Sequence, residues 1–109
     1  MKNVLVVGNS NEMQQIFSML IMGNIGTCIH ANNIISAIRT VYSRKLDVLI
    51  ISSKELVDTK LNFLSFVHEC FSGIRVMVAF DNGLCNLHDV PDNSDIIMSN
   101  CIEDIAHKI

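Results

Sequence analysis

Charged residues are scarce in this chain: they make up 17% of its 109 residues, whereas half of the residues are hydrophobic. This composition excludes an intrinsically disordered segment. The length fits one domain, and a domain of this size can bury a real core without disulfides or metals. Positive charge is not in excess either, because the formal net charge is -3. That balance argues against direct binding of nucleic acid, since surfaces that bind nucleic acid are normally basic.

Long apolar runs are lacking as well. No run reaches the roughly 18 apolar residues that a membrane span needs. The apolar stretch near the N-terminus, Val4 to Val7, is too short for the core of a signal peptide. We therefore expect a cytoplasmic protein that makes no contact with a membrane.

The chain has no CxxC pair, although it has four cysteines. A zinc site or a thioredoxin-type site is therefore not expected. Nothing in the sequence suggests secretion, so we expect reduced and mostly buried thiols rather than disulfides. The cysteines are Cys28, Cys70, Cys85 and Cys101.

What the sequence does contain is a series of short apolar runs with the β-branched content of strands. They are nearly continuous and do not alternate with polar residues. This pattern indicates strands that are covered on both faces, and hence a parallel sheet. The runs are residues 3–7, 47–52, 75–80 and 95–99, with a weaker candidate at 27–31.

Helical patterns lie between these runs, with apolar residues at spacings of three and four. The first has Ser10 or Asn11 as a candidate N-cap and Gly23 as a C-terminal signal. Residues 81–94 contain the only proline and are predicted to form a loop with at most a turn or two of helix. The predicted helices are residues 11–23, 32–45, 60–71 and 100–109.

This order of elements predicts an α/β fold. Parallel strands joined through helices make right-handed crossovers and a doubly wound sheet. Five strands in this order fit a single flavodoxin-like domain with strand order 2-1-3-4-5. Helices would cover both faces, and the fourth would be short or irregular. In such folds the functional site lies at the carboxyl ends of the strands.

Three stretches stand out beside the order of the elements: KNVLVVGNSNEMQQIF, SAIRTVYSRKLDVLIIS and SDIIMSN. They are similar to the opening, to the second helix and third strand, and to the last strand of a receiver domain of two-component response regulators. Over essentially all of residues 1–109, the chain resembles such a receiver domain. The resemblance implies a flavodoxin-like fold. It also implies the N-terminal part of a longer protein, followed by an output domain such as a DNA-binding domain or an ATPase.

Receivers work through five positions at the carboxyl edge of the sheet. Two acids hold Mg²⁺, an aspartate takes the phosphoryl group, and a Thr/Ser and a Lys contact the phosphate. The resemblance places the two acids on Gly8 and Asn9, the phosphoacceptor on Ser52, the Thr/Ser on Ala79 and the Lys on Ser99. None of the five groups is kept. The chain therefore resembles a degenerate receiver, or pseudo-receiver, with no catalytic residue, metal or cofactor.

The function that this resemblance implies is a non-catalytic, phosphorylation-independent signalling module that acts by protein–protein contact or dimerisation. In receivers, the fourth helix, last strand and last helix mediate such contacts. The corresponding residues 84–109 are unusually apolar here. The expected interaction surface consists of Leu84, Leu87, Val90, Ile102, Ile105 and Ile109.

A second hypothesis from the residues is a small flavodoxin-like domain that binds a ligand or acts as an enzyme. Loops 8–12, 52–60 and 79–84 would form its pocket. They contain neither GxGxxG nor GxxxxGK[ST], and a Ser52–His30 nucleophile pair would lack a third member and a glycine-rich elbow. The candidate polar liners are Asn9, Ser10, Ser52, Ser53, Asp81 and Asn82.

Overall fold

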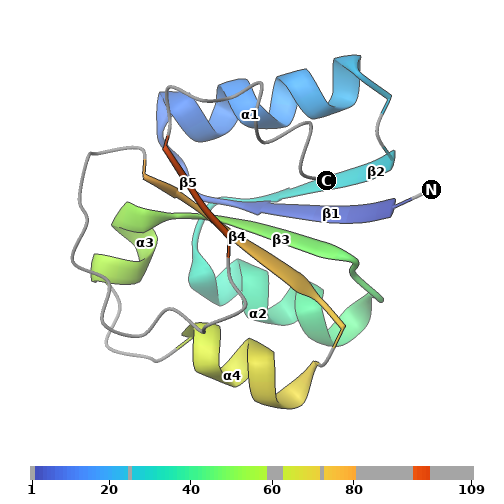
Figure 1. Ribbon diagram of the computed structural model, residues 1–109, viewed down its shortest axis with the longest axis vertical. Helices are drawn as coiled ribbons and strands as arrows, with labels where there is room; N and C mark the ends of the chain where they lie inside the picture. The colour runs from blue at the N-terminus through green and yellow to red at the C-terminus, as the bar shows by residue number, and fades with distance from the viewer. Residues whose placement is uncertain (1, 25, 59–62, 72, 81–94, 99–109) are drawn as a thin grey trace.

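The apolar runs form a parallel sheet with helices on both of its faces (Figure 1). The computed structural model describes residues 2–24, 26–58, 63–71, 73–80 and 95–98. The strands are β1 (Lys2–Val7), β2 (Gly26–Ala31), β3 (Val48–Ser52), β4 (Arg75–Phe80) and β5 (Asp95–Met98). The helices are α1 (Asn11–Met22), α2 (Ile34–Ser43), α3 (Ser53–Asp58) and α4 (Phe63–Cys70). The predicted α/β class is confirmed.

The first four strands lie in the order β2-β1-β3-β4, and each neighbouring pair is parallel. The order of these four agrees with the prediction, and the weak candidate at 27–31 is a strand. The backbone of β5 runs parallel to β4, from Met77 opposite Asp95 to Phe80 opposite Met98. Because all of these pairs are parallel, the carboxyl ends of the strands meet at one edge of the sheet.

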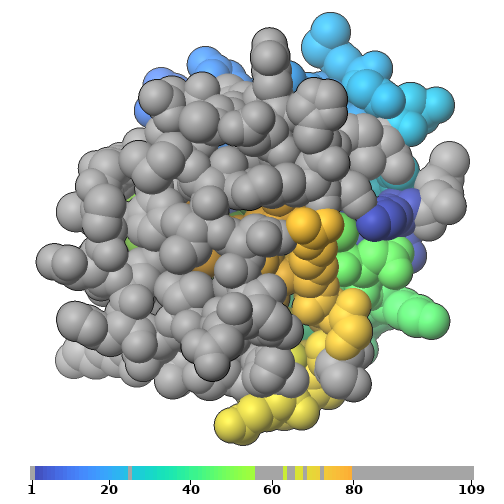
Figure 2. All heavy atoms as spheres, in the orientation of Figure 1, coloured from blue at the N-terminus to red at the C-terminus, as the bar shows by residue number. Residues whose placement is uncertain are grey.

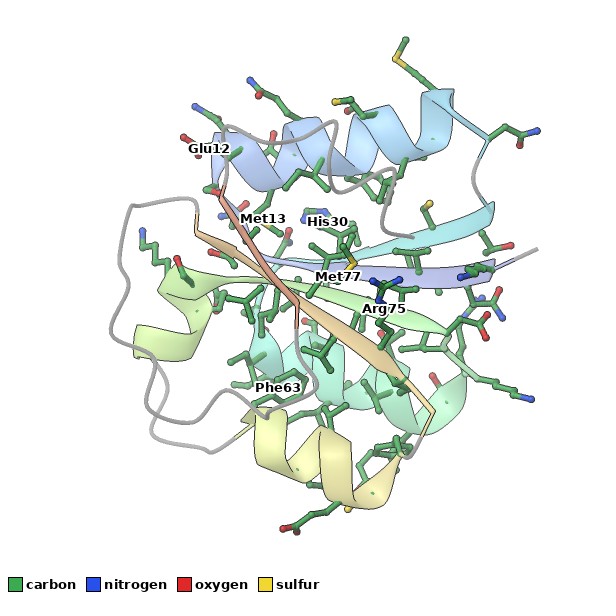
Figure 3. All side chains as sticks on the ribbon, viewed as in Figure 1. Glu12, Met13, His30, Phe63, Arg75 and Met77 are labelled. Carbon is green, nitrogen blue, oxygen red and sulfur yellow. The ribbon has the colours of Figure 1, made fainter. Side chains whose placement is uncertain are left out.

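The sheet separates two apolar cores, because successive side chains of a strand point to opposite faces. On one face Val4 and Val6 pack with the apolar stripe of α1. On the other face Leu5 and Val7 pack under α2 and α4. Figure 3 shows this division, with Met13 and Met77 on the α1 side and Phe63 on the other. Burial on both faces explains why the strands read as continuous apolar runs.

Polar caps fix where the helices begin. The Ser10 side chain accepts a hydrogen bond from the Met13 amide at the start of α1, and the Asn33 side chain accepts one from the Ser36 amide at the start of α2. At the end of α1, Gly23 keeps a right-handed conformation and Asn24 has the positive φ of 52°. The predicted helix end is correct, but asparagine rather than glycine makes the left-handed turn.

One prediction about the helices needs revision, because α3 begins directly after β3, where no helix is predicted. The helix predicted over 60–71 is confirmed as α4 over Phe63–Cys70, and residues 60–62 lie outside the described residues. The six residues of α3 are too few to display a helical period, which explains the omission. The loop predicted over 81–94 and the helix predicted over 100–109 lie outside the described residues.

The cysteines of the described segments differ in exposure. Cys28 on β2 is half-buried, and burial raises the pKa of its thiol. Cys70 at the end of α4 is exposed, so the expectation of mostly buried thiols is wrong for this residue. Cys85 and Cys101 lie outside the described residues. Within those same segments, no helix is both long and apolar enough to cross a membrane.

Two adjacent isoleucines on α2 test the packing of the sheet. Ile34 is 5% exposed and packs in the core, whereas Ile35 is 68% exposed. We expect Ile34→Ala to lower the free energy of unfolding by about 2–4 kcal/mol and Ile35→Ala to change it by less than about 0.5 kcal/mol. Urea denaturation followed by circular dichroism measures both. Equal losses for the two variants would contradict the placement of α2.

The raised pKa of Cys28 predicts a pH dependence. At a given alkaline pH, less thiolate forms at Cys28 in the folded chain than in the unfolded chain, so its alkylation midpoint shifts to higher pH on folding. The unfolded chain loses this proton first, so the contribution to stability falls as pH rises above the unfolded pKa. Iodoacetamide labelling of Cys28, quantified by peptide mapping with and without urea, measures the two midpoints. Coincident midpoints would exclude the shift.

Candidate functional site

Three of the five expected site positions come together at the carboxyl edge of the sheet. Gly8 follows β1 directly, and its amide donates to the Ala31 carbonyl on β2 at 2.9 Å. Ser52 ends β3 and lies opposite Ala79 of β4 in the register. Asn9 follows Gly8 and is exposed. Ser99, the fifth position, lies outside the described residues.

Gly8 is packed so closely that a side chain at its position would force its neighbours to move. A Cβ atom on Gly8 would lie 2.7 Å from Cβ of Ser52 and 2.9 Å from Cγ of Met13. The φ angle of Gly8 is +142°, which residues with a side chain rarely adopt. Ser52 and Met13 therefore fill the space beside Gly8 at this edge.

His30 holds the carbonyl of Gly8 from the neighbouring strand. Its Nε2 atom lies 2.6 Å from the Gly8 oxygen, and because a carbonyl oxygen only accepts, Nε2 carries a proton and donates. The His30 ring also packs on Phe17 of α1, with ring centroids 5.3 Å apart. Since this nitrogen is a donor, it cannot act as a base for Ser52. The sequence gives only a weak indication that His30 binds this carbonyl, because it shows a single histidine one residue before the end of an edge strand.

Ser52 has a structural role at this edge. Its side chain is 1% exposed, and its Oγ accepts a hydrogen bond from the Lys54 amide at 3.2 Å. This bond caps the first turn of α3, as a serine before a helix commonly does. Ser53, the next residue, is 0% exposed. The resemblance to receivers placed a lost phosphoacceptor at Ser52. The hydrogen bond by which Ser52 caps α3 was not predicted from the sequence.

The edge carries no charged side chain at Gly8, Asn9, Ser52 or Ala79. Glu12 stands nearby in the first turn of α1 (Figure 3). Among the described residues, no group of three or more His, Cys, Asp or Glu side chains could hold a metal ion.

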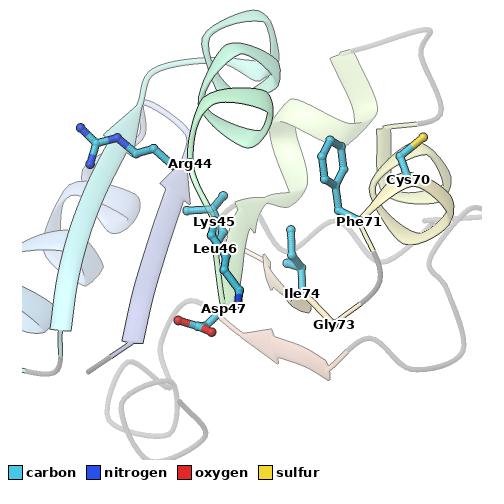
Figure 4. Close-up of a pocket in the computed structure, with 8 residues that line it drawn as sticks. All are labelled: Arg44, Lys45, Leu46, Asp47, Cys70, Phe71, Gly73 and Ile74. Carbon is cyan, nitrogen blue, oxygen red and sulfur yellow. The ribbon is translucent and has the colours of Figure 1, made fainter.

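Two cavities lined by described residues lie away from this edge. One of about 330 Å³ lies at the opposite edge, where Leu46 and Asp47 precede β3 and Gly73 and Ile74 precede β4 (Figure 4). The other, of about 590 Å³, is an open depression on α1. The pocket expected at loops 8–12, 52–60 and 79–84 falls partly on residues outside the described ranges. Its candidate liners Asp81 and Asn82 lie outside the described residues, as do Leu84, Leu87, Val90, Ile102, Ile105 and Ile109.

No protein-family model matches the chain, and no curated protein or solved structure matches it. The function is therefore argued from the residues at the edge and from their geometry.

Two glycines with positive φ test how tightly the edge is closed. At Gly73, φ is +96° and an added Cβ would have no atom within 4 Å. We therefore expect Gly73→Ala to lower the free energy of unfolding by about 1–2 kcal/mol from backbone strain alone. Gly8→Ala adds the contacts with Ser52 and Met13 and is expected to cost about 1–3 kcal/mol more. Urea denaturation of both variants gives the difference. A Gly8→Ala variant no less stable than Gly73→Ala would show that the edge has room for a side chain.

Proposed function

We propose that this chain is a degenerate receiver domain that acts as a phosphorylation-independent protein-interaction module. The proposed fold is a single five-stranded flavodoxin-like domain, with β5 as its last strand. The parallel order β2-β1-β3-β4 and the backbone pairing of β5 with β4 support this assignment. The proposed partners are another protein or a second copy, and an output domain attached after residue 109.

The observation that carries this proposal is the close packing at Gly8 together with the uncharged residues at Gly8, Asn9, Ser52 and Ala79. A receiver needs space and oxygen ligands for Mg²⁺, a nucleophile, and positive charge beside the phosphoryl group. Here Gly8 leaves no room for an acid, and the hydroxyl of Ser52 is buried and bonded to the Lys54 amide. Ala79 has no hydroxyl to offer. The same substitutions remove the metal site, the nucleophile and one phosphate contact.

Burial at this edge also counts against the alternative of a ligand-binding or enzymatic domain. That alternative needs polar groups that face a cavity at the carboxyl ends of the strands. Ser52 and Ser53, two of its candidate liners, are 1% and 0% exposed. No specific observation favours it, and the interaction module is preferred.

Chemical phosphorylation tests the proposal directly. We expect the chain to keep an unchanged intact mass after incubation with acetyl phosphate and Mg²⁺, because Gly8 and Asn9 stand where a receiver has its two acids and the hydroxyl of Ser52 is buried. A phosphorylatable receiver treated in parallel serves as the positive control. A stable phosphoryl adduct that maps to Ser52 would contradict the proposal.

The variant Ser52→Asp makes the same test sharper, because it restores the nucleophile without the metal site. We expect no adduct on this variant, and a loss of stability because the new carboxylate is buried without a cation. Intact mass spectrometry and thermal melting measure the two effects. Efficient, Mg²⁺-dependent phosphorylation of Ser52→Asp would mean that the edge retains a working metal site.

A further inference from the structure

Three aromatic rings meet on the face of the sheet that α2 and α4 cover (Figure 1). The ring centroid of Tyr42 on α2 lies 5.9 Å from that of Phe66 and 5.4 Å from that of Phe71, and the two phenylalanine centroids are 5.9 Å apart. Phe66 and Phe71 pack against the core, whereas Tyr42 is 66% exposed. The two inner rings therefore support the third, and Tyr42 presents an aromatic side chain to solvent.

α2 and the segment after it extend this aromatic surface. Ile35, Arg39 and Tyr42 follow one another at spacings of four and three, so they share one face of the helix, and all three are exposed. The cavity of about 330 Å³ lies between residues 44–47 and the end of α4 (Figure 4), and Phe71 belongs both to its lining and to the aromatic cluster. Figure 2 shows the green segment that leads into β3 projecting from the body of the molecule. The α2–α4 patch consists of Ile35, Arg39, Tyr42, Lys45, Phe66 and Phe71.

Positive charge is concentrated around this patch. Residues 13–46 contain three basic residues, Arg39, Arg44 and Lys45, and no Asp or Glu. The whole chain has eight basic and eleven acidic residues, so the rest of the chain has five basic and eleven acidic residues and a formal charge of -6. All three basic side chains are exposed. Among the described residues, no carboxylate forms an ion pair with any of them.

Two described acids border the patch. Asp47 lines the same cavity, but its carboxylate is half-buried and accepts a hydrogen bond from the Asn3 amide at 2.8 Å. Glu69 on α4 is exposed. The three basic side chains outnumber these two acids, so the surroundings of the patch keep a positive formal charge on a chain that is acidic overall.

This separation of charge indicates which kind of partner fits the patch. Physiological salt screens exposed charges over about 8 Å, so a short acidic segment on the patch meets mainly the local positive charge. A nucleic acid or an anionic bilayer extends well beyond that distance and meets the acidic remainder of the chain. A flat bilayer also cannot enter the cavity beside Phe71, whereas a side chain of a peptide can.

We propose that the α2–α4 patch binds an acidic segment of a partner protein that carries an aromatic side chain. This inference rests on the proposed role as an interaction module and names its surface and the chemistry of its partner. The aromatic side chain of the partner packs against Tyr42 and Phe71, because aromatic pairs gain energy beyond their buried area. The carboxylates of the partner lie beside Arg39 and Lys45 at the border of the contact, where complementary charge favours association.

Fluorescence anisotropy of a short fluorescein-labelled peptide of alternating glutamate and tyrosine tests the proposal with the full chain. We expect saturable binding that weakens as salt is added, since exposed charges supply part of the attraction. The same peptide with lysine in place of glutamate is the charge control and is expected not to bind. The proposal is overturned by an absence of saturable binding of the glutamate peptide up to about 1 mM chain, or by equal binding of the lysine peptide.

Substitutions locate the binding surface. Lys45→Glu reverses a charge without touching the packed rings and is expected to weaken binding about threefold to tenfold. Lys54→Glu, at an exposed lysine of α3, is the matched control and is expected to change binding by less than about twofold. Tyr42→Ala is expected to weaken binding at least about fivefold, and Met22→Ala, at an exposed side chain of α1, is its control.

Thermal melting verifies that each variant is folded, and Lys45→Glu tests the patch independently of any effect of Tyr42→Ala on the packing of α4. Equal effects of Lys45→Glu and Lys54→Glu overturn the proposal. Tighter binding of a single-stranded oligonucleotide or of phosphatidylserine vesicles than of the glutamate peptide also overturns it.

These outcomes are separate from the test of the proposed function. Failure of the peptide to bind leaves the intact mass after treatment with acetyl phosphate as expected for a degenerate receiver. Conversely, a phosphoryl adduct at Ser52 would remove the proposed function, and binding of the acidic peptide at the α2–α4 patch would still be observed.

Discussion

The contact between Gly8 and Ser52 is the constraint on which the edge of this fold depends. The chain leaves β1 at a φ of +142°, and the position of Gly8 has no space for a Cβ between Ser52 and Met13. The amide of Gly8 is bound to Ala31, and its carbonyl is bound to His30. Two strands and a helix therefore converge on one residue without a side chain. Ser10 caps α1 only two residues later, so the direction in which α1 crosses the sheet depends on the same turn.

The sheet was predictable because burial on both faces leaves a direct mark in the sequence. Val4 to Val7 and Val48 to Ile51 are fully or almost fully buried, so nearly every residue of these runs is apolar. The cap Ser10 was readable from the sequence, because a polar residue before an apolar stripe acts locally. α3 was not predictable, because its six residues are too few to display a helical period.

The sequence predicted which residues lie at the candidate site, but it did not predict how they pack. Gly8, Ser52 and Ala79 could be placed together because parallel strands end at a common edge. That the edge is closed depends on the φ angle of Gly8 and on the position of Met13, which lies on a different element. His30 was missed because its contact joins residues 22 positions apart. Long-range contacts of this kind leave no periodic pattern in the sequence, so composition and spacing alone could not indicate them.

The packing at this edge bears on the proposed role as a degenerate receiver. A ligand shifts a conformational equilibrium only through contacts that differ between the two states. In a receiver the phosphate supplies those contacts, and here the positions that would make them are neutral or buried. Met13 both closes the edge and begins the buried stripe of α1, so the filled edge fixes the helix against the sheet. The packing that leaves no phosphoryl site in the proposed degenerate receiver is therefore the same packing that anchors the start of α1 to the sheet.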